Sequence, residues 1–318
     1  MAGIAMGPVI LNHQSFGATG IPTRPFGKTG ERISIIGLGG WDFIQRKTES
    51  ESLRYLHQAV DGGITFMDNA WEYNRGRSEE LMGKALAQDG YRKKVFLMTK
   101  VCARDYKTGK EQINQSLKRL QSDHVDLLQV HSIQYPGDPQ RVFDPENGVI
   151  KAMVEAQQAG KTKYLGFSGH MYPEMHLEMI NMFDWDAVQL PLNILDAHYN
   201  SFQKKVLPVL NQKGIAALGM KSLAAQNGRL SREVNVSADL CRRYVMSLPI
   251  ATLVCGMQSF EELQEDLQRA QNFKPLTEVE INRLLDIAKE PAKDGAIEAY
   301  KDMKNYFGCS HHSSVLKG

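Results

Sequence analysis

Short apolar runs alternate with longer amphipathic segments along most of the chain. Runs such as 33–38 and 215–220 are mostly apolar, which is typical of strands buried on both faces. The pattern predicts eight strands, at 33–38, 65–69, 95–101, 125–130, 163–167, 187–190, 215–220 and 252–255. Helical spacing of apolar residues predicts a helix after each strand, at 49–60, from a cap at Ser78, and at 112–120, 149–158, 173–181, 203–211, 237–247 and 260–270.

Eight successive units of strand and helix favour an α/β protein with a closed (β/α)8 TIM barrel. Residues 23–34 predict an N-terminal β-hairpin around the turn at 27–30, and residues 281–288 predict a C-terminal helical extension. We therefore expect a single barrel domain over 1–318, in which 1–22 form an N-terminal arm. The polar tail at 289–318 is expected to lie over the surface.

Charge and hydropathy exclude several classes of partner. The chain has 38 basic and 36 acidic side chains, a net charge of +2, and no long basic run, so nucleic-acid binding is not expected. No apolar run approaches the roughly 20 residues of a membrane span. The first ten residues lack the charged region of a signal peptide, so we expect a cytoplasmic protein without a membrane partner. The oligomeric state stays open.

The cysteines and histidines show no short metal-binding spacing. Cys102, Cys241, Cys255 and Cys309 are far apart in the chain and are interpreted as reduced thiols. His311 and His312 lie in a serine-rich tail and are interpreted as solvated, so no metal is expected.

Four titratable residues fall at the ends of three successive predicted strands. Asp68 and Tyr73 follow the second strand, Lys100 ends the third and His131 ends the fourth. In a (β/α)8 barrel these strand ends meet at the face that carries the active site. Packing alone explains one such residue easily, but it does not explain four different ones on neighbouring strands.

Asp68, Tyr73, Lys100 and His131, in this order and at these strand ends, resemble the catalytic tetrad of the aldo-keto reductases. The five-residue step from Asp68 to Tyr73 matches that family, and the resemblance extends from the hairpin to about Ala270. It implies NAD(P)H-dependent reduction of an aldehyde or ketone to an alcohol, with substrates that are small carbonyl compounds.

The chemistry of carbonyl reduction gives each residue of this set a role. Tyr73 would donate the proton as general acid, and the Lys100 ammonium would favour its ionised form. Asp68 would keep Lys100 charged and oriented. His131 would hydrogen-bond the carbonyl oxygen and fix its angle.

No Gly-x-Gly-x-x-Gly run follows a strand, so a Rossmann domain is not supported. The resemblance instead implies an extended dinucleotide across the barrel face, with Ser168 and Gln189 on the carboxamide and Ser259 on a phosphate. The expected cofactor contacts are Gly40, Trp41, Ser168, Gly169, His170, Gln189, Met220, Lys221, Ser222, Gly256, Ser259, Glu262 and Asp266.

Three positions in this set depart from the family pattern. Gly169 and His170 stand where an Asn is expected, and Met220 where many members have an aromatic residue. No Arg or Lys occurs from Gly256 to Asp266, although a 2′-phosphate usually requires one. NADP(H) is the cofactor that the family implies, and NAD(H) is the alternative that this departure favours.

The expected substrate contacts are Trp41, Trp71, Tyr73, His131, Met171 and Tyr172. Trp71 precedes Tyr73 by two positions and is expected near the reacting carbonyl. A rim of aromatic and apolar side chains suits apolar or aromatic aldehydes and ketones. The sequence does not identify the substrate or the physiological direction.

Two other functions fit part of the pattern. A barrel aldolase would use Lys100 or Lys221 as a Schiff-base nucleophile, which would leave Tyr73 without a role. A non-catalytic or slow cofactor-binding regulatory subunit, like the β-subunits of potassium channels that the chain also resembles, would bind the cofactor tightly and turn over little.

Overall fold

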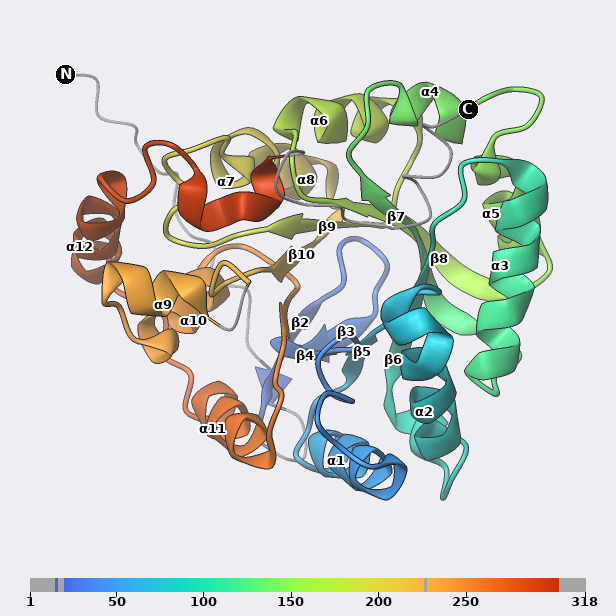
Figure 1. Ribbon diagram of the computed structural model, residues 1–318, viewed down its shortest axis with the longest axis horizontal. Coiled ribbons are helices and arrows are strands. Elements are labelled where there is room, and N and C mark those ends of the chain that lie inside the picture. Colours follow the sequence, from blue (N-terminus) through green and yellow to red (C-terminus); the bar gives the residue numbers. More distant parts are fainter. Residues whose placement is uncertain (1–14, 17–19, 226–227, 303–318) are drawn as a thin grey trace.

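Eight parallel strands close into a barrel at the centre of the molecule (Figure 1). The computed structural model describes residues 15–16, 20–225 and 228–302; the expected positions of Cys309, His311, His312 and most of the N-terminal arm lie outside these ranges. The barrel strands are β4 (Ile36–Gly39), β5 (Phe66–Asp68), β6 (Phe96–Val101), β7 (Val125–Ile133), β8 (Thr162–Gly169), β9 (Ala187–Pro191), β10 (Ala216–Met220) and β11 (Thr252–Cys255). They pair in chain order, and β11 returns to pair with β4. The (β/α)8 prediction is therefore confirmed.

Helices connect the strands and surround them (Figure 1). The main helices are α1 (Glu49–Asp61), α2 (Arg77–Leu86), α3 (Tyr106–Arg119), α5 (Val149–Gln158), α6 (Pro173–Met182), α8 (Leu207–Lys213), α10 (Ala238–Ser247) and α11 (Phe260–Gln271). Short elements join them: η1 (Tyr73–Gly76), η2 (Tyr91–Lys94), α4 (Asp138–Val142), α7 (Phe202–Lys205) and α9 (Arg229–Val234). Each main helix covers the barrel with its apolar face, as the spacing predicted.

The N-terminal hairpin closes the barrel at the end where the strands begin. Strands β2 (Pro22–Pro25) and β3 (Arg32–Ser34) pair antiparallel, and β1 (Ser15–Phe16) adds to β2. Phe26 and Ile33 pack on Phe66 and Phe96, the first residues of two barrel strands. The apolar run 33–38 is thus divided between two sheets, because β3 belongs to the hairpin and β4 to the barrel.

Two helix predictions need correction. Helix α2 begins at Arg77 after Gly76, which has φ 88°, so Ser78 lies inside the helix and its hydroxyl accepts from Asn74 instead of capping. The helix predicted at 203–211 is divided at Val206 into α7 and α8. Pro208, in the first turn of α8, has no N–H to continue the hydrogen bonds of α7.

The C-terminal extension packs into the protein and does not only cover its surface. Helix α12 (Glu278–Lys289) is followed by η3 (Ala296–Lys301), which buries Tyr300 and Lys301. Lys301 Nζ lies 2.7 Å from Asp196 and 3.0 Å from Glu298, and all three side chains are almost completely buried. Burial raises the pKa of Asp196 to about 6, while the Lys301 ammonium opposes that rise. This ion cluster fixes η3 on the segment that follows β9.

In the described part of the chain, no helix combines the length and apolar character needed to cross a membrane.

Replacing Lys301 by Met should strongly destabilise the protein. The change leaves Asp196 and Glu298 buried without their cation, and such a loss costs about 3–5 kcal/mol. Chemical unfolding followed by circular dichroism measures it. Lys293→Met is the control, because the pair of Lys293 with Glu290 is exposed and is worth about 0–1 kcal/mol. Equal effects of both changes would contradict the role of the buried cluster.

Candidate active site

The four predicted catalytic residues come together at the C-terminal face of the barrel. Asp68 ends β5, Lys100 lies in β6 and His131 lies in β7, and these three strands are neighbours in the barrel. Tyr73 begins η1, directly after β5. The strand order alone therefore places the four side chains on adjacent elements.

Lys100 is the centre of this group. Its Nζ donates to Asp68 Oδ1 at 2.5 Å, to the Asn69 carbonyl oxygen at 2.8 Å and to the Tyr73 hydroxyl at 3.1 Å. The Lys100 side chain is 1% exposed. Burial lowers the pKa of the Lys100 ammonium, and the Asp68 carboxylate opposes this by favouring the charged form.

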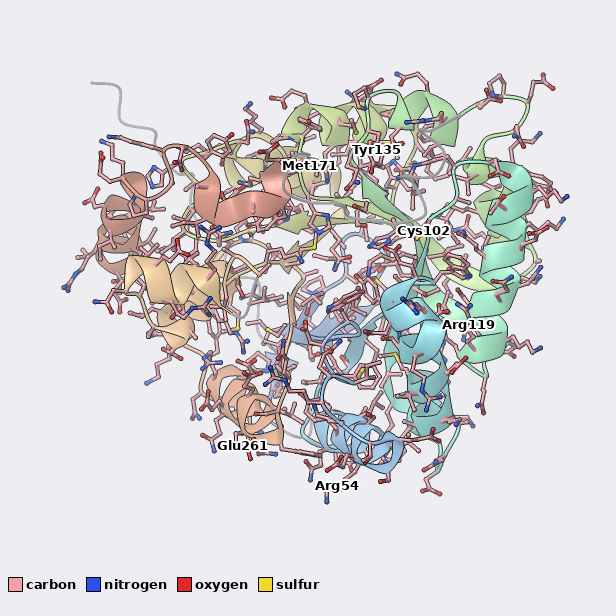
Figure 2. All side chains as sticks on the ribbon, in the orientation of Figure 1. Arg54, Cys102, Arg119, Tyr135, Met171 and Glu261 are labelled. Carbon is pink, nitrogen blue, oxygen red and sulfur yellow. The ribbon has the colours of Figure 1, made fainter. Side chains whose placement is uncertain are left out.

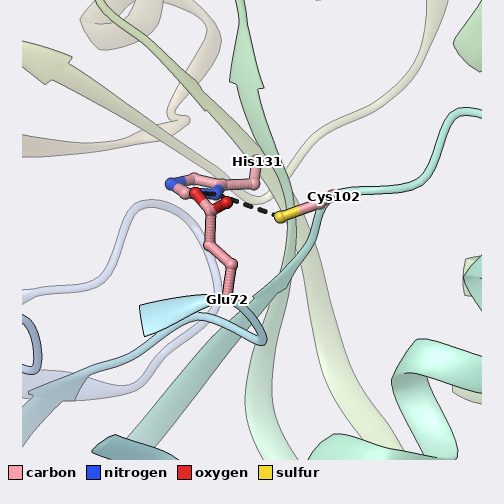
Figure 3. Close-up of side chains that lie close together, drawn as sticks. All are labelled: Glu72, Cys102 and His131. Atoms are coloured by element: carbon pink, nitrogen blue, oxygen red, sulfur yellow. Dashed lines mark hydrogen bonds and ion pairs between the residues drawn. The ribbon is translucent and has the colours of Figure 1, made fainter. Parts of the chain in front are cut away.

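His131 contacts two residues that the sequence analysis missed. Its Nδ1 lies 3.2 Å from Glu72 Oε1 and 3.4 Å from Cys102 Sγ, and the three side chains converge from separate segments (Figure 3). The His131 ring also lies edge-on to Tyr73, with 5.6 Å between ring centroids. The position of Glu72 beside Tyr73 and of Cys102 just past β6 was the available signal, since strand ends form the active face.

A buried arginine braces the segment that carries His131. Arg104 donates to the carbonyl oxygens of His131 at 3.0 Å and Ser132 at 3.2 Å. Its guanidinium also lies 3.2 Å from Asp138, at the start of α4. The brace holds the end of β7, where Ser132 has a positive φ of 51°.

Trp41 and Tyr73 form the exposed rim above Lys100. Their rings meet edge-on at 5.6 Å, and Trp41 is 50% exposed. Asn74 links the two segments, because its amide donates to the Trp41 carbonyl oxygen at 3.0 Å. Gly40 packs against the Asp68 backbone so closely that a side chain would not fit there.

Three other predicted substrate contacts, Trp71, Met171 and Tyr172, are not part of the rim formed by Trp41 and Tyr73. The Trp71 indole donates to Gln115 at 2.8 Å and faces the Arg119 guanidinium, so it is held against α3. Figure 2 shows Arg119 between α2 and α3. Met171, on the segment after β8, is fully buried and does not form an open rim (Figure 2). Tyr172 is half-buried and stands at the N-cap position of α6, where its side chain makes no capping hydrogen bond.

The inner cofactor candidates gather beside Asp68. Gln189 donates to Asp68 at 3.4 Å, while its Oε1 is buried and has no hydrogen-bond partner among the described residues. Ser168 accepts from the backbone N–H of Ser132 at 3.0 Å. Gln189 Oε1 is therefore a buried acceptor that suits an amide donor from a ligand.

Gly169 and His170 occupy a tightly packed corner. A side chain at position 169 would collide with His176 and with β7, which explains a glycine there. His170 Nδ1 lies 3.4 Å from the Ser132 hydroxyl, and its ring meets Tyr300 edge-on at 6.1 Å. Burial lowers the pKa of His170 well below its ordinary value, and the charge of Lys221 adds to this.

The end of β10 lies in the core, and the segment that follows it begins with a charged residue. Met220 is 8% exposed and packs with the apolar side chains inside the barrel. Lys221 has a positive φ of 62°, and its ammonium lies 6.0 Å from the Tyr300 ring. Ser222 is 5% exposed. Burial raises the pKa of nearby Asp42, whereas Gln258 and Lys221 lower it.

The N-terminus of α11 forms the other end of this face. Ser259 caps the helix by accepting from the Glu262 N–H at 3.2 Å, and Glu262 in turn accepts from the Gln258 N–H. Gly256 lies directly against Asp42. Lys47, from the segment after β4, donates to the Gln258 carbonyl oxygen. Lys47 thus brings one basic group beside 256–266, where its charged neighbours are the carboxylates of Asp42, Glu51, Glu261 and Glu262.

Asp266 does not lie on the surface of this face. Its carboxylate is 1% exposed and is paired with Arg242 of α10 and Arg269 of α11. The resemblance placed Asp266 among the expected cofactor contacts, because it stands at a position that the family often uses for the adenosine end, but the ion pairs direct it inward.

Comparison with known proteins places these residues in a family context. The model of the aldo/keto reductase family matches residues 35–243, which extend from β4 into α10 and include Asp68, Tyr73, Lys100 and His131. Aldo-keto reductase YhdN of Bacillus subtilis is 32% identical over 240 residues, covering 68% of this chain and 67% of the relative. The uncharacterized oxidoreductase YqkF of the same organism is 27% identical over 312 residues, covering 84% and 96%.

The fold is shared with solved structures. The holo form of aldo-keto reductase AKR11C1 from Bacillus halodurans superimposes with a TM-score of 0.71 at 23% identity, covering 86% of this chain and all of that one. At this identity the similarity concerns the fold.

The ion pair between Arg104 and Asp138 should stabilise the protein more at neutral pH than in acid. Burial raises the pKa of Asp138, but the Arg104 guanidinium and two backbone N–H groups outweigh it, so the pKa lies below its ordinary value. A lowered carboxyl pKa gives stability that is present above the unfolded value of about 3.9 and lost as the pH falls through the folded value. Asp138→Asn should therefore cost about 3 kcal/mol near neutral pH and less below about pH 3.

Urea unfolding of wild type and variant at the two pH values measures this difference. Asp184→Asn is the control, since its pair with Lys28 is exposed and should be worth less than about 1 kcal/mol. A pH-independent effect of Asp138→Asn would contradict the electrostatic origin of the brace.

Proposed function

Since the chain belongs to the aldo/keto reductase family, whose members are oxidoreductases that use nicotinamide cofactors, we propose that it reduces aldehydes or ketones to alcohols with Tyr73 as the proton donor. One observation supports this most directly: Lys100 Nζ lies within hydrogen-bonding distance of both Asp68 and the Tyr73 hydroxyl. A buried ammonium against a phenol favours the phenolate that remains after proton donation to a carbonyl.

The residues at the C-terminal face fit a nicotinamide dinucleotide. Gln189 Oε1 is a buried acceptor without a partner among the described residues, which suits the amide N–H of a carboxamide. The N-terminus of the 12-residue helix α11, with Ser259 as its cap, suits a phosphate. When bound, the cofactor supplies the hydride that reduces the carbonyl carbon.

The side chains of this protein then manage the proton and the carbonyl oxygen. Tyr73 donates its hydroxyl proton to that oxygen, and the Lys100 ammonium stabilises the phenolate that remains. Asp68 keeps Lys100 oriented toward Tyr73. His131, edge-on to the Tyr73 ring, orients the carbonyl oxygen between them. Proton transfer of this kind contributes roughly 10²–10⁴-fold to the rate.

The exposed rim favours apolar carbonyl substrates. Trp41 presents a half-exposed indole beside the Tyr73 ring, which offers a flat apolar surface next to the proton donor. Aromatic aldehydes and ketones are the substrate class that this surface suits. Trp71, held against α3, does not contribute to that surface.

Lys47 is the group near α11 that favours NADPH over NADH, while Glu261 and Glu262 make the first turn of that helix acidic. Asp266 is neutralised by Arg242 and Arg269 and is too deeply buried to bind a ribose hydroxyl. Lys47 brings an ammonium to the Gln258 carbonyl, beside the start of α11. A lysine there suits the additional phosphate of NADPH.

Tyr73→Phe should lower kcat by roughly 10²–10⁴-fold, because it removes the proton donor and leaves the ring in place. Oxidation of NADPH or NADH with a panel of aromatic and aliphatic aldehydes, followed by absorbance, measures the change. Cofactor affinity, measured by fluorescence quenching, should stay unchanged. Tyr91→Phe in η2, whose hydroxyl contacts Asp61, is the matched control and should retain full activity.

Other outcomes of that assay would reject the proposal. Tight cofactor binding without turnover by wild type would indicate a regulatory subunit. No binding of either nucleotide would reject the reductase, and borohydride trapping of a substrate on Lys100 or Lys221 would indicate an aldolase.

Lys47→Met should raise the KM for NADPH about tenfold and change that for NADH much less. A charge-assisted hydrogen bond is worth about 1.5 kcal/mol, and only NADPH carries the 2′-phosphate. Steady-state kinetics with both cofactors measures the two values. Lys94→Met, a half-exposed lysine of η2, is the control. An equal rise for both cofactors would show that Lys47 acts only through its contact with Gln258.

A further inference from the structure

Glu72, Cys102 and His131 form a cluster of three different metal-binding groups beside the proposed proton donor (Figure 3). We propose that this cluster binds one Zn²⁺ ion through Glu72 Oε1, Cys102 Sγ and His131 Nδ1. The sequence predicts no metal, because its cysteines lack a short metal-binding spacing, and Glu72, Cys102 and His131 are separated by 30 and 29 positions.

Two of the three pairs of donor atoms already have the separation found between zinc ligands. All three lie within 4.8 Å of one another, with 3.2 Å from His131 Nδ1 to Glu72 Oε1 and 3.4 Å from His131 Nδ1 to Cys102 Sγ. In tetrahedral zinc sites with Zn–S of about 2.3 Å and Zn–N or Zn–O of about 2.0–2.2 Å, ligand atoms lie about 3.3–3.6 Å apart. An ion can therefore enter with small shifts of the side chains.

The chemistry of the three donors favours zinc over hard cations. A thiolate and an imidazole are ligands that Mg²⁺ and Ca²⁺ avoid and that Zn²⁺ prefers. Three protein ligands leave the fourth position of the ion for a water molecule or a substrate oxygen, as in catalytic zinc sites. Binding displaces the proton of the Cys102 thiol into solvent, and His131 binds as the neutral imidazole that carries its proton on Nε2.

The surrounding structure holds two of the ligands in place before any ion binds. Cys102 is fully buried and its backbone N–H donates to Gln112 at 2.8 Å. His131 is 3% exposed and its carbonyl oxygen is held by Arg104. The Glu72 side chain is 12% exposed and offers the route by which an ion reaches the cluster. Preorganised ligands lower the cost of binding.

A simpler role for Glu72 alone is to orient His131 by accepting a hydrogen bond from its Nδ1. That role needs no thiol, so Cys102 distinguishes the two explanations. If the proposed reductase function holds, an ion on His131 Nδ1 changes the imidazole whose ring lies edge-on to Tyr73, with 5.6 Å between ring centroids, and should therefore inhibit turnover reversibly. Binding itself does not rest on that function.

The test uses the full-length protein stripped with a chelator and titrated with Co²⁺, whose bond to a thiolate gives an intense near-ultraviolet absorption. We expect one Co²⁺ per chain, with this absorption, displaced by one equivalent of Zn²⁺. Cys102→Ser should abolish the absorption and weaken Zn²⁺ binding at least about 100-fold, since even loss of an outer-shell partner costs 10–100-fold. Glu72→Gln should keep the absorption and weaken Zn²⁺ binding at least about tenfold.

Two control variants locate the ion. Cys255→Ser replaces another buried thiol, in β11, and should leave Co²⁺ binding unchanged. A variant with Cys309→Ser, His311→Ala and His312→Ala removes the potential ligands of the tail and should also bind normally. Binding that disappears with the tail variant and persists in Cys102→Ser would overturn the proposal, as would the absence of any thiolate absorption in wild type.

Thermal unfolding distinguishes the loss of a metal ligand from misfolding of a variant. Zn²⁺ should raise the Tm of wild type and not that of Cys102→Ser, because an ion that binds only the folded state stabilises it. A Cys102→Ser variant that is folded normally has the same Tm as wild type without metal. If Zn²⁺ then raises the Tm of this variant as much as it raises that of wild type, the proposed site is wrong. Failure of the reductase assay would leave each of these binding results intact.

Discussion

The burial of one ammonium group, that of Lys100, governs the arrangement of the C-terminal face. A charge withdrawn from water costs several kcal/mol unless it is paired and hydrogen-bonded. Here Asp68 supplies the charge, and the Asn69 carbonyl and the Tyr73 hydroxyl supply the remaining acceptors. Because these partners come from β5 and the turn that follows it, the register of β5 on β6 and the path of that turn must both be correct for the ammonium to be tolerated.

Polar side-chain contacts also fix the loops next to this face. Asn74 ties the Tyr73 turn to the segment of Trp41, and Arg104 ties the end of β6 to the end of β7. Lys301 does the same for the C-terminal extension and the segment after β9. Loops are normally the variable part of a barrel, and here a polar side chain fixes each of these three segments. The positions of the proposed catalytic groups therefore depend on residues that take no part in the chemistry.

His131 takes part in both proposals made for this face, the reduction and the metal site. His131 presents one side of its ring to Tyr73 and directs Nδ1 toward Glu72 and Cys102. In the aldo/keto reductase family the first relationship fits carbonyl reduction, whereas the second gives this chain a set of donor atoms suited to a metal ion. The two are coupled through one imidazole, so occupancy of Nδ1 changes what the ring offers to a substrate.

The sequence by itself determined the barrel and the group around Lys100. Eight apolar runs separated by helical spacing leave few ways to bury every strand, and residues at successive strand ends must meet at one face of a closed barrel. Prediction failed where contacts join distant segments. The sequence could not show that Asp266 turns inward to Arg242, that Lys47 reaches α11, that Trp71 leans on α3, or that Glu72 and Cys102 meet at His131. Those side chains are placed by the partners that satisfy their charge or hydrogen bonds in the folded protein, and only the tertiary structure decides which partners are near.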